Sequence, residues 1–174
     1  MCHPGADYIL ASAVSYENPV LRSLIWQFKF QRRTSAAREL AAIICTFLQT
    51  LRVDLTEFLF VPIPLHPRRA RERGFNQADL LAQRIAACYH SKPAADILKK
   101  VKSTVPQTEM RGWAERSKNL SGCFSVARPE LVRGRNIALV DDVWTSGTTM
   151  NEAARMLKEA GAKKIIAVTA SKAG

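Results

Sequence analysis

The stretch LVDDVWTSGTTMNEAARMLKEAG, residues 139–161, joins an apolar segment to a helical one through two acidic and several small polar residues. The aliphatic residues 136–141 predict a buried strand, and the sequence from Thr148 or Thr149 to Gly161 predicts a helix that the glycine ends. Adjacent carboxylates are costly to bury unless they contact a partner, so Asp141 and Asp142 need one. We therefore expect a ligand site where this strand gives way to the helix.

The remainder of the C-terminal two thirds alternates in the same way. The predicted strands cover residues 58–64, 95–101, 123–127, 136–141 and 164–170, a predicted helix runs from Asn76 to about Tyr89, and residues 102–120 are predicted to form a long loop. Strand–helix–strand units with short connections indicate an α/β fold with a mainly parallel sheet flanked by helices. In such sheets ligands bind outside the carboxyl ends of the strands.

The N-terminal third has a different pattern. Apolar residues at helical spacing predict helices over residues 18–31 and from Thr34 or Ser35 to about Leu51, with Trp26 expected in the core. We therefore divide the chain into an N-terminal helical segment, 1–52, and a larger domain, 53–174.

Composition favours a globular protein with an anionic partner. Hydrophobic residues make up 47% of the 174 residues and charged residues 24%, and the net charge is +11. One basic cluster contains Arg68, Arg69, Arg71 and Arg73, and a second contains Lys99, Lys100, Lys102, Arg111, Arg116 and Lys118. Such clusters bind phosphates in some proteins and are merely solvated in others.

Several classes of protein are disfavoured. The longest largely apolar run, residues 40–48, is far shorter than the roughly 20 residues that span a bilayer, so no membrane insertion is expected. The four cysteines form no CxxC pair, so we predict neither a disulfide framework nor zinc. The N-terminus lacks a signal-peptide pattern, and a reduced, cytoplasmic protein is expected.

The segment after the acidic pair is suited to phosphate. Small residues between a strand and a helix expose backbone N–H groups at the positive end of the helix dipole. It is neither a Walker loop nor a dinucleotide fingerprint, because no GxxxxGK[ST] and no GxGxxG occurs. A ribose 5-phosphate would satisfy both parts, with phosphate in the loop and hydroxyls on Asp141 and Asp142. The structural alternatives are a hydroxyl-capped helix and an acidic pair bound to arginines or helix ends.

VDDVWTSGTT, residues 140–149, resembles the 5-phosphoribosyl-1-pyrophosphate (PRPP) signature of type I phosphoribosyltransferases. The resemblance extends to RGFNQ at 73–77 and to the spaced residues Gln107, Arg116, Asn119 and Phe124, which are similar to those of the ComF family. It covers residues 53–174 strongly and the N-terminal helices weakly. It implies the phosphoribosyltransferase-like (type I) form of the α/β fold.

The resemblance also implies roles for individual residues. Asp141 and Asp142 would hold the ribose hydroxyls and favour the positive charge of an oxocarbenium-like transition state, with Arg116 also in a catalytic role. The 5′-phosphate loop would be Val143, Thr145, Ser146, Gly147, Thr148 and Thr149. The pyrophosphate loop would be Leu65, His66, Arg69 and Arg73, and the mobile covering loop would supply Lys102, Gln107 and Arg116. Magnesium would enter with PRPP, with no metal held by the protein alone.

Some of these residues also have a structural interpretation. His66, between prolines, is not expected to act as a base. Asn76 and Gln77 either touch ligand or brace the next helix, and Trp144 either shields the ribose or packs away from it. Relatives often begin with a four-cysteine zinc-ribbon-like segment, of which only Cys2 is present here.

The resemblance leaves several functions open. The first is a PRPP-binding ComF protein acting in DNA uptake and natural transformation, with single-stranded DNA and a competence helicase as partners. Its DNA contacts would be Arg68, Arg69, Arg71, Lys99 and Lys100, with Phe75 and Trp113 as stacking residues. The alternatives are an active phosphoribosyltransferase with an unidentified acceptor and a non-catalytic PRPP-sensing regulator. Many relatives dimerise, but no segment here marks a dimer face.

Overall fold

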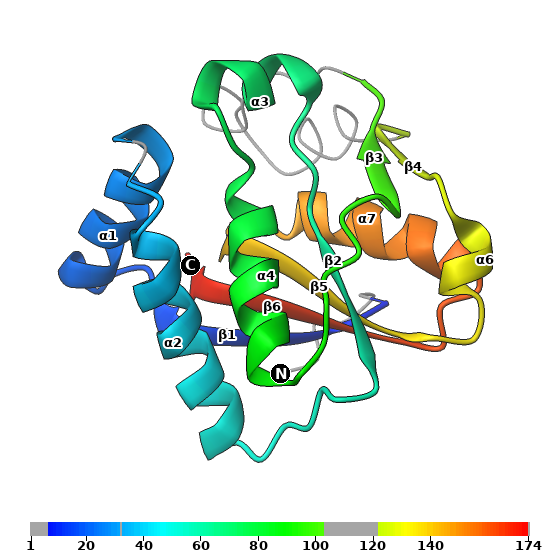
Figure 1. Cartoon of the computed structure of the whole chain (residues 1–174), viewed down its shortest axis with the longest axis horizontal. Coiled ribbons are helices and arrows are strands. Elements are labelled where there is room, and N and C mark those ends of the chain that lie inside the picture. Colours follow the sequence, from blue (N-terminus) through cyan, green and yellow to red (C-terminus); the bar gives the residue numbers. More distant parts are fainter. Residues whose placement is uncertain (1–6, 32, 103–121, 174) are drawn as a thin grey trace.

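A parallel four-stranded sheet forms the centre of the protein (Figure 1). The computed structural model describes residues 7–31, 33–102 and 122–173. The strands are β1 (Ile9–Ser15), β2 (Phe58–Pro62), β5 (Asn136–Trp144) and β6 (Lys164–Lys172), in the order β1–β6–β5–β2. Each neighbouring pair is parallel, which confirms the predicted α/β class.

Helices cover both faces of this sheet (Figure 1). The helices α1 (Pro19–Phe30), α2 (Ala36–Thr50) and α4 (Gln77–Cys88) share one hydrophobic cluster with one face, and α7 (Thr148–Glu159) shares a second cluster with the other. Successive side chains of a strand point to opposite faces. Accordingly Ala138 and Val140 belong to the first cluster, whereas Ile137 and Leu139 belong to the second.

The N-terminal segment contributes a strand that the sequence analysis did not predict. Strand β1 pairs with β6 from Ile9 opposite Ile166 to Ser15 opposite Lys172. Its sequence, ILASAVS, is short and rich in small residues, so its alternation is weak and pairing with a long neighbour determines its structure. The hydrophobic core also crosses residue 52, because side chains of α1 and α2 pack in one cluster with those of β2 and β5.

Several predicted boundaries were wrong, including the ends of β2 and β6, which lie at Pro62 and Lys172 instead of at residues 64 and 170. Strand β5 continues to Trp144 instead of ending at Asp141, because Val143 and Trp144 remain paired with β6, and the acidic residues therefore lie within the strand. The predicted strands 95–101 and 123–127 are shorter, β3 (Leu98–Lys100) and β4 (Phe124–Val126), and form a separate antiparallel pair. The arginine-rich segment after β2 forms a helix, α3 (Pro67–Arg73), and a short α6 (Pro129–Val132) precedes β5.

Trp26 lies on the outside of α1, and its predicted place in the core was wrong. Leu21, Ile25 and Phe28 form the buried face of this helix, while Trp26 is 53% exposed. Consecutive residues of a helix are about 100° apart, so a tryptophan directly after the buried Ile25 falls beside that face. Phe28 occupies the core position and lies against Phe75 with ring centroids 5.6 Å apart.

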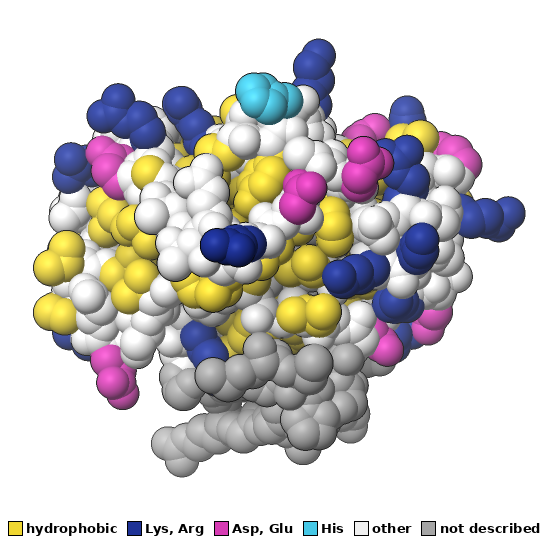
Figure 2. Space-filling view, turned by 90° about the horizontal axis from the view of Figure 1, so that it is seen from below, with side chains coloured by type: hydrophobic (Ala, Val, Ile, Leu, Met, Phe, Trp, Pro, Cys, Tyr) yellow, Lys and Arg dark blue, Asp and Glu magenta, His cyan; other side chains and the backbone are white. Residues whose placement is uncertain are grey.

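On the side of the molecule turned away from α3, the positively charged side chains are dispersed and form no single patch. Seen from below, Lys and Arg side chains are scattered over that side, and hydrophobic side chains lie in its middle (Figure 2). Helix α3, at the top of Figure 1, carries four arginines in seven residues. No helix in the described part of the chain is long and apolar enough to cross a membrane.

Phe28→Ala should destabilise the protein far more than Phe30→Ala. Phe28 is fully buried, and truncating a buried phenylalanine costs about 3–5 kcal/mol. Phe30, two residues later, is 62% exposed, and its loss should cost about 1 kcal/mol or less. Urea unfolding of the two variants measures both costs, and equal costs would contradict the assignment of the buried face of α1.

Candidate functional site

The two adjacent carboxylates lie near the end of β5. Asp142 points toward the α1 side of the sheet, where its Oδ1 is 2.9 Å from the Lys29 Nζ, and only 7% of its side chain is exposed. Asp141 lies where the charges of Asp142, Lys29 and Lys100 all act on its carboxyl group. The backbone N–H of Asp142 donates to Asp141 Oδ1 at 2.8 Å, which fixes the first carboxylate against the strand. The pair therefore places carboxylate oxygens close to Lys29 of α1 and Lys100.

Lys29 is a site residue that the sequence analysis missed. Burial lowers its pKa, but the Asp142 and Asp141 carboxylates raise it by more, so the pKa lies above its ordinary value and the lysine is charged. Its position between two phenylalanines in an amphipathic helix could have marked it as a lysine near the core. Only the tertiary structure shows that it faces a carboxylate. The N-terminal helix thereby becomes part of the site.

The environment of Asp141 disfavours its charge. Burial is the largest cause and the Asp142 carboxylate adds to it, which raises the pKa of Asp141 from 3.8 to about 7. Lys29, Lys100 and the hydrogen bond from the backbone of Asp142 act in the opposite direction. Near neutral pH the Asp141 carboxyl group therefore gains or loses its proton easily.

Helix α3 carries two of the predicted pyrophosphate residues, Arg69 and Arg73, and the other two, Leu65 and His66, directly precede it. Pro67 occupies its first turn, the His66 Nδ1 accepts a 3.3 Å hydrogen bond from the Arg68 N–H, and Gly74 ends it with φ 83°. His66 is thus a helix cap, as its place between prolines suggested, and Leu65 precedes it, partly buried. This capping hydrogen bond is a structural role that is sufficient to explain a histidine at this position.

Arg73, the last residue of α3, is the arginine that reaches the site. Its Nη1 donates to the Gln77 Oε1 at 3.0 Å, and its guanidinium carbon lies 5.7 Å from the centroid of the Phe30 ring. The charges of Asp142, Asp141 and Arg69 all act on it, so these residues are near neighbours. Arg73 therefore lies close to the acidic pair, with Arg69 as its neighbour on α3.

Asn76 and Gln77 brace the start of α4. The Asn76 Oδ1 accepts from the Ala78 N–H at 3.2 Å, and its Nδ2 donates to the Ile63 carbonyl and the Asp79 carboxylate. Gln77 is buried and holds Arg73, while its Nε2 has no hydrogen-bond partner among the described residues. These contacts favour the bracing interpretation, with Gln77 orienting Arg73.

The predicted phosphate loop lies between β5 and α7. Gly147 has φ 74° and precedes the first residue of α7, and a Cβ there would come within 2.8 Å of the Trp144 ring. The Ser146 and Thr148 hydroxyls are 2.7 Å apart. The glycine is required both by its backbone conformation and by the ring behind it, so the loop can approach a phosphate closely.

Trp144 packs away from the acidic pair. Its Nε1 donates to the Tyr8 hydroxyl at 3.0 Å, and the Lys172 Nζ lies 5.3 Å from its ring centroid. The structure thus favours the packing alternative for Trp144. Of the predicted loop, Val143 belongs to β5 and Thr148 and Thr149 to the first turn of α7, so Thr145, Ser146 and Gly147 form the loop itself.

The β3–β4 pair closes another side of the site. Burial lowers the pKa of Lys100, and the charges of Cys123 and Asp141 oppose that effect, so Lys100 lies toward the acidic pair. Lys100 also lies over the Phe124 ring at 5.7 Å. Lys99 and Lys102 are exposed. Gln107, Trp113 and Arg116, from the predicted covering loop, lie outside the described residues.

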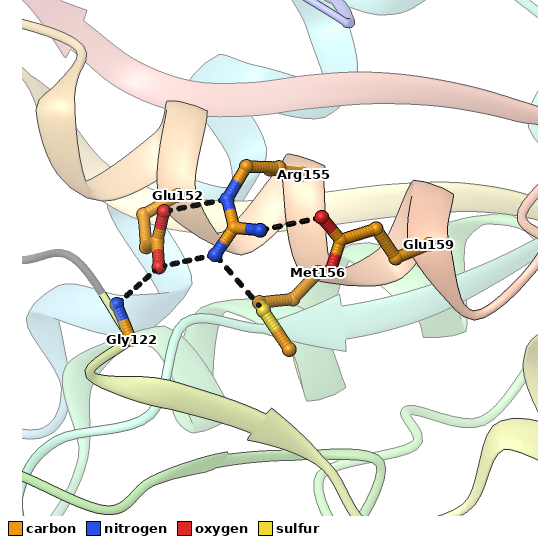
Figure 3. A network of polar contacts seen from close by, with 5 residues as sticks. All are labelled: Gly122, Glu152, Arg155, Met156 and Glu159. Atoms are coloured by element: carbon orange, nitrogen blue, oxygen red, sulfur yellow. Dashed lines mark hydrogen bonds and ion pairs between the residues drawn. The ribbon is translucent and has the colours of Figure 1, made fainter.

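A network on α7 anchors the chain just before β4 (Figure 3). The Glu152 Oε1 accepts hydrogen bonds from the Gly122 N–H at 2.6 Å and from the Arg155 Nη2 at 2.8 Å, and Arg155 also bonds Glu159. The bond from Arg155 is the largest of the effects that lower the pKa of Glu152. The carboxylate therefore remains charged and holds the start of the β4 segment against the helix behind the phosphate loop.

The acidic pair offers oxygen atoms to a metal ion, but the described residues do not form a metal site made of protein ligands alone. In the part of the chain that the structure describes, no three His, Cys, Asp or Glu side chains come together as a metal-binding group. Asp142 is ion-paired with Lys29, which leaves Asp141 as the nearest carboxylate for Mg²⁺. Mg²⁺ commonly binds through one or two carboxylates together with substrate phosphates, and this donor set fits only that arrangement.

Residues 71–174 match the phosphoribosyl transferase domain, a stretch that contains Arg73, the acidic pair and the phosphate loop. The chain belongs to this family. It is 35% identical over 150 residues to competence protein F of Haemophilus influenzae, covering 83% of this chain and 65% of that protein. It is 34% identical over 152 residues to the DNA utilization protein YhgH of Escherichia coli, covering 84% and 65%.

A third relative is competence protein ComFC of Bacillus subtilis, 31% identical over 144 residues, or 83% of this chain and 56% of that protein. Together these matches confirm membership of the ComF family of phosphoribosyltransferase-like proteins. The chain spans about two thirds of the length of the first two relatives. The ribose, phosphate and pyrophosphate roles predicted for single residues are compatible with the geometry and stay predictions.

Lys29→Met should destabilise this phosphoribosyltransferase-like chain by about 2–3 kcal/mol. It leaves the buried Asp142 without its cation, and the cost should lie between the ~1 kcal/mol of an exposed pair and the ~3–5 kcal/mol of a fully buried one, because Lys29 is 25% exposed. The exposed Lys92→Met is the control for loss of one charge. Urea unfolding at pH 7 measures both, and equal stabilities would contradict a structural ion pair.

Stability should fall as the pH rises from about 4 to 7, through the Asp141 carboxyl. Its folded pKa lies above its ordinary value, so in this window the folded state keeps a proton that the unfolded state has released. Asp141→Asn removes this group and retains the others, so its stability relative to the original protein should increase with pH. Urea unfolding of both at pH 5 and pH 8 tests this, and a constant difference would refute it.

Proposed function

We propose that this protein binds PRPP together with Mg²⁺ at the carboxyl ends of β2 and β5, and acts in DNA uptake and natural transformation. The observation that carries the first part is the acidic pair in β5, separated only by Val143 and Trp144 from a glycine-containing loop at the start of α7. One ligand with a phosphate next to vicinal hydroxyls is complementary to that arrangement. PRPP adds a pyrophosphate, for which cations are present.

The ribose 5-phosphate half of the ligand would use β5 and α7. The first backbone N–H groups of a helix have no intrahelical partner and attract anions, and no side chain caps α7 at Gly147. The ribose hydroxyls would donate to the carboxylates, above all to Asp141. Because only the ionised carboxylate has all its acceptor sites, ligand binding should favour deprotonation of Asp141 near neutral pH.

The pyrophosphate half would face α3. Arg73 and Arg69 are neighbours there, and guanidinium groups pair well with phosphate oxygens. Leu65 and His66 would contribute backbone at the end of the preceding strand. When bound, Mg²⁺ would neutralise charge on the pyrophosphate leaving group. Lys29, already bound to Asp142, would hold that carboxylate in place beside the ribose.

The chemistry at the anomeric carbon is open between two alternatives. The acidic pair can stabilise positive charge on the ribose, which supports transfer to an acceptor. The same pair can simply bind the sugar, which supports a PRPP-sensing regulator. Lys102, Gln107 and Arg116 would cover the ligand in either case and exclude water. Pyrophosphate release measured with a panel of bases and amines separates the two: release indicates an enzyme, and its absence with PRPP bound indicates a sensor.

The DNA part of the proposal comes from the relatives and from charge. Two of them are named competence proteins and one a DNA utilization protein. The net charge of +11 and the exposed Arg68 and Arg71 are compatible with phosphate contacts. A competence helicase as partner and a cytoplasmic location belong to the same proposal. Lys100 is oriented to the acidic pair, so its contribution would be to the phosphoribosyl site.

Titration calorimetry with PRPP and Mg²⁺ tests the ligand. The protein should bind PRPP, and Asp141→Asn with Asp142→Asn should weaken binding at least ten-fold by removing the acceptors for the ribose hydroxyls. Glu17→Gln with Glu130→Gln makes the same charge change at exposed positions and should bind like the original protein. Asp141→Asn alone keeps the Lys29–Asp142 ion pair and separates ligand loss from loss of folding. No binding by the original protein would refute the proposal.

A further inference from the structure

The outer side of α1 carries an aromatic pair that the core does not use. Trp26 and Phe30 are 53% and 62% exposed, and their ring centroids are 6.0 Å apart with the planes tilted by 40°. The helix already buries Leu21, Ile25 and Phe28 on its inner side. Large exposed aromatic side chains lying side by side are unusual on a folded surface and commonly mark a binding site.

Cations continue this aromatic pair along the helix. Arg22, Trp26 and Phe30 are spaced by four residues and form one row, the α1 strip, which is about 12 Å long. Arg22 is exposed at one end. At the other end the Arg73 guanidinium lies 5.7 Å over the Phe30 ring. Arg33 lies beside the strip, held by a 2.6 Å hydrogen bond to the Gln27 Oε1.

The Phe30 end of the α1 strip lies beside two residues that interact with the acidic pair. Lys29, directly before Phe30, contacts Asp142 at 2.9 Å, and Arg73, which packs on Phe30, lies within the field of both carboxylates. Helix α1 lies at the periphery of the molecule, beside α2 (Figure 1). The strip therefore runs outward from the proposed phosphoribosyl site.

We propose that the α1 strip is a docking site for single-stranded DNA, with bases stacked on Trp26 and Phe30 and phosphates bound by Arg22, Arg33 and Arg73. Aromatic rings interleaved with cations are the composition of surfaces that bind single strands, because every base has a face to stack and every nucleotide a phosphate. A surface for an uncharged apolar partner would gain nothing from these arginines. The inference rests on the DNA part of the proposed function and assigns the DNA contacts to α1.

This location differs from the one that the sequence analysis predicted. Helix α3 carries Arg68, Arg69 and Arg71, but it has no aromatic residue, and Arg68 is ion-paired with Glu72 at 3.1 Å. Of the two predicted stacking residues, Phe75 is partly buried against Phe28, and Trp113 lies outside the described residues. Stacking requires an accessible ring face, which Trp26 and Phe30 provide. Helix α3 would then add only phosphate contacts.

The test compares a normal and a base-free strand. Fluorescence anisotropy measures the affinity of a labelled oligothymidine and of an abasic strand of equal length, with the same phosphates. The original protein should bind oligothymidine at least ten-fold more tightly. Trp26→Ala with Phe30→Ala should weaken oligothymidine binding at least ten-fold and leave abasic binding nearly unchanged, because each stacked base contributes substantially and independently of charge. Arg22→Ala should lower the salt dependence of both strands.

Val20→Ala with Leu51→Ala is the matched control. These side chains are 76% and 55% exposed and lie off the strip, so their loss removes apolar surface without removing rings, and binding should not change. Trp26→Phe with Phe30→Tyr keeps the rings and should restore most of the affinity. Circular dichroism and calorimetry with PRPP show that each variant is folded and that its phosphoribosyl site is intact.

The outcomes separate the claims. Oligothymidine binding by the Trp26→Ala, Phe30→Ala variant at the original affinity overturns the α1 strip as the DNA site. PRPP binding without any single-strand binding by the original protein overturns the DNA part of the proposed function and the strip together. DNA binding through the strip without PRPP binding overturns only the phosphoribosyl part. A change in sedimentation of the variant without loss of DNA binding assigns the strip to a protein interface and refutes the inference.

Discussion

The ion pair between Lys29 and Asp142 is the contact on which the arrangement of the site depends. It connects the N-terminal helix to the strand that carries the acidic pair, across the hydrophobic cluster that both share. A carboxylate that is almost fully buried needs such a cation, and a lysine at the edge of an apolar helix face needs an anion. Each group thus accounts for the other. The contact holds α1 beside the acidic pair, where Phe30 of this helix lies against Arg73.

The two carboxylates of β5 have different charged neighbours. Asp142 is bound to Lys29 of α1, whereas Asp141 is close enough to Lys100 of β3 to oppose the lowering of that lysine's pKa by burial. The two acids therefore have different partners despite being adjacent. The extension of β5 to Trp144 keeps the acidic pair inside the strand, because Asp141, Val143 and Trp144 are all paired with β6.

Much of the sheet could be predicted from the sequence, because buried parallel strands read as short aliphatic runs and β2, β5 and β6 have them. Strand β1 could not, since small residues with weak alternation gain their structure from pairing. Asp141, Asp142 and the loop residues were identified because a local motif carries them. Lys29 was missed because its importance lies in a contact between residues more than one hundred positions apart. Trp26 was misplaced because a tryptophan in an amphipathic segment was assigned to the buried face.

The position of β1 has a consequence for how the chain is made. It is an edge strand whose neighbour in the sheet is β6, so residues 9–15 must wait for residues 164–172 before they can pair. During synthesis the first helix can form, but Lys29 cannot contact Asp142 until β5 has been made. Contacts between such distant segments slow folding, because a long loop must close first. The exposed aromatic side of α1 would meanwhile be open to chaperones and to other nascent chains.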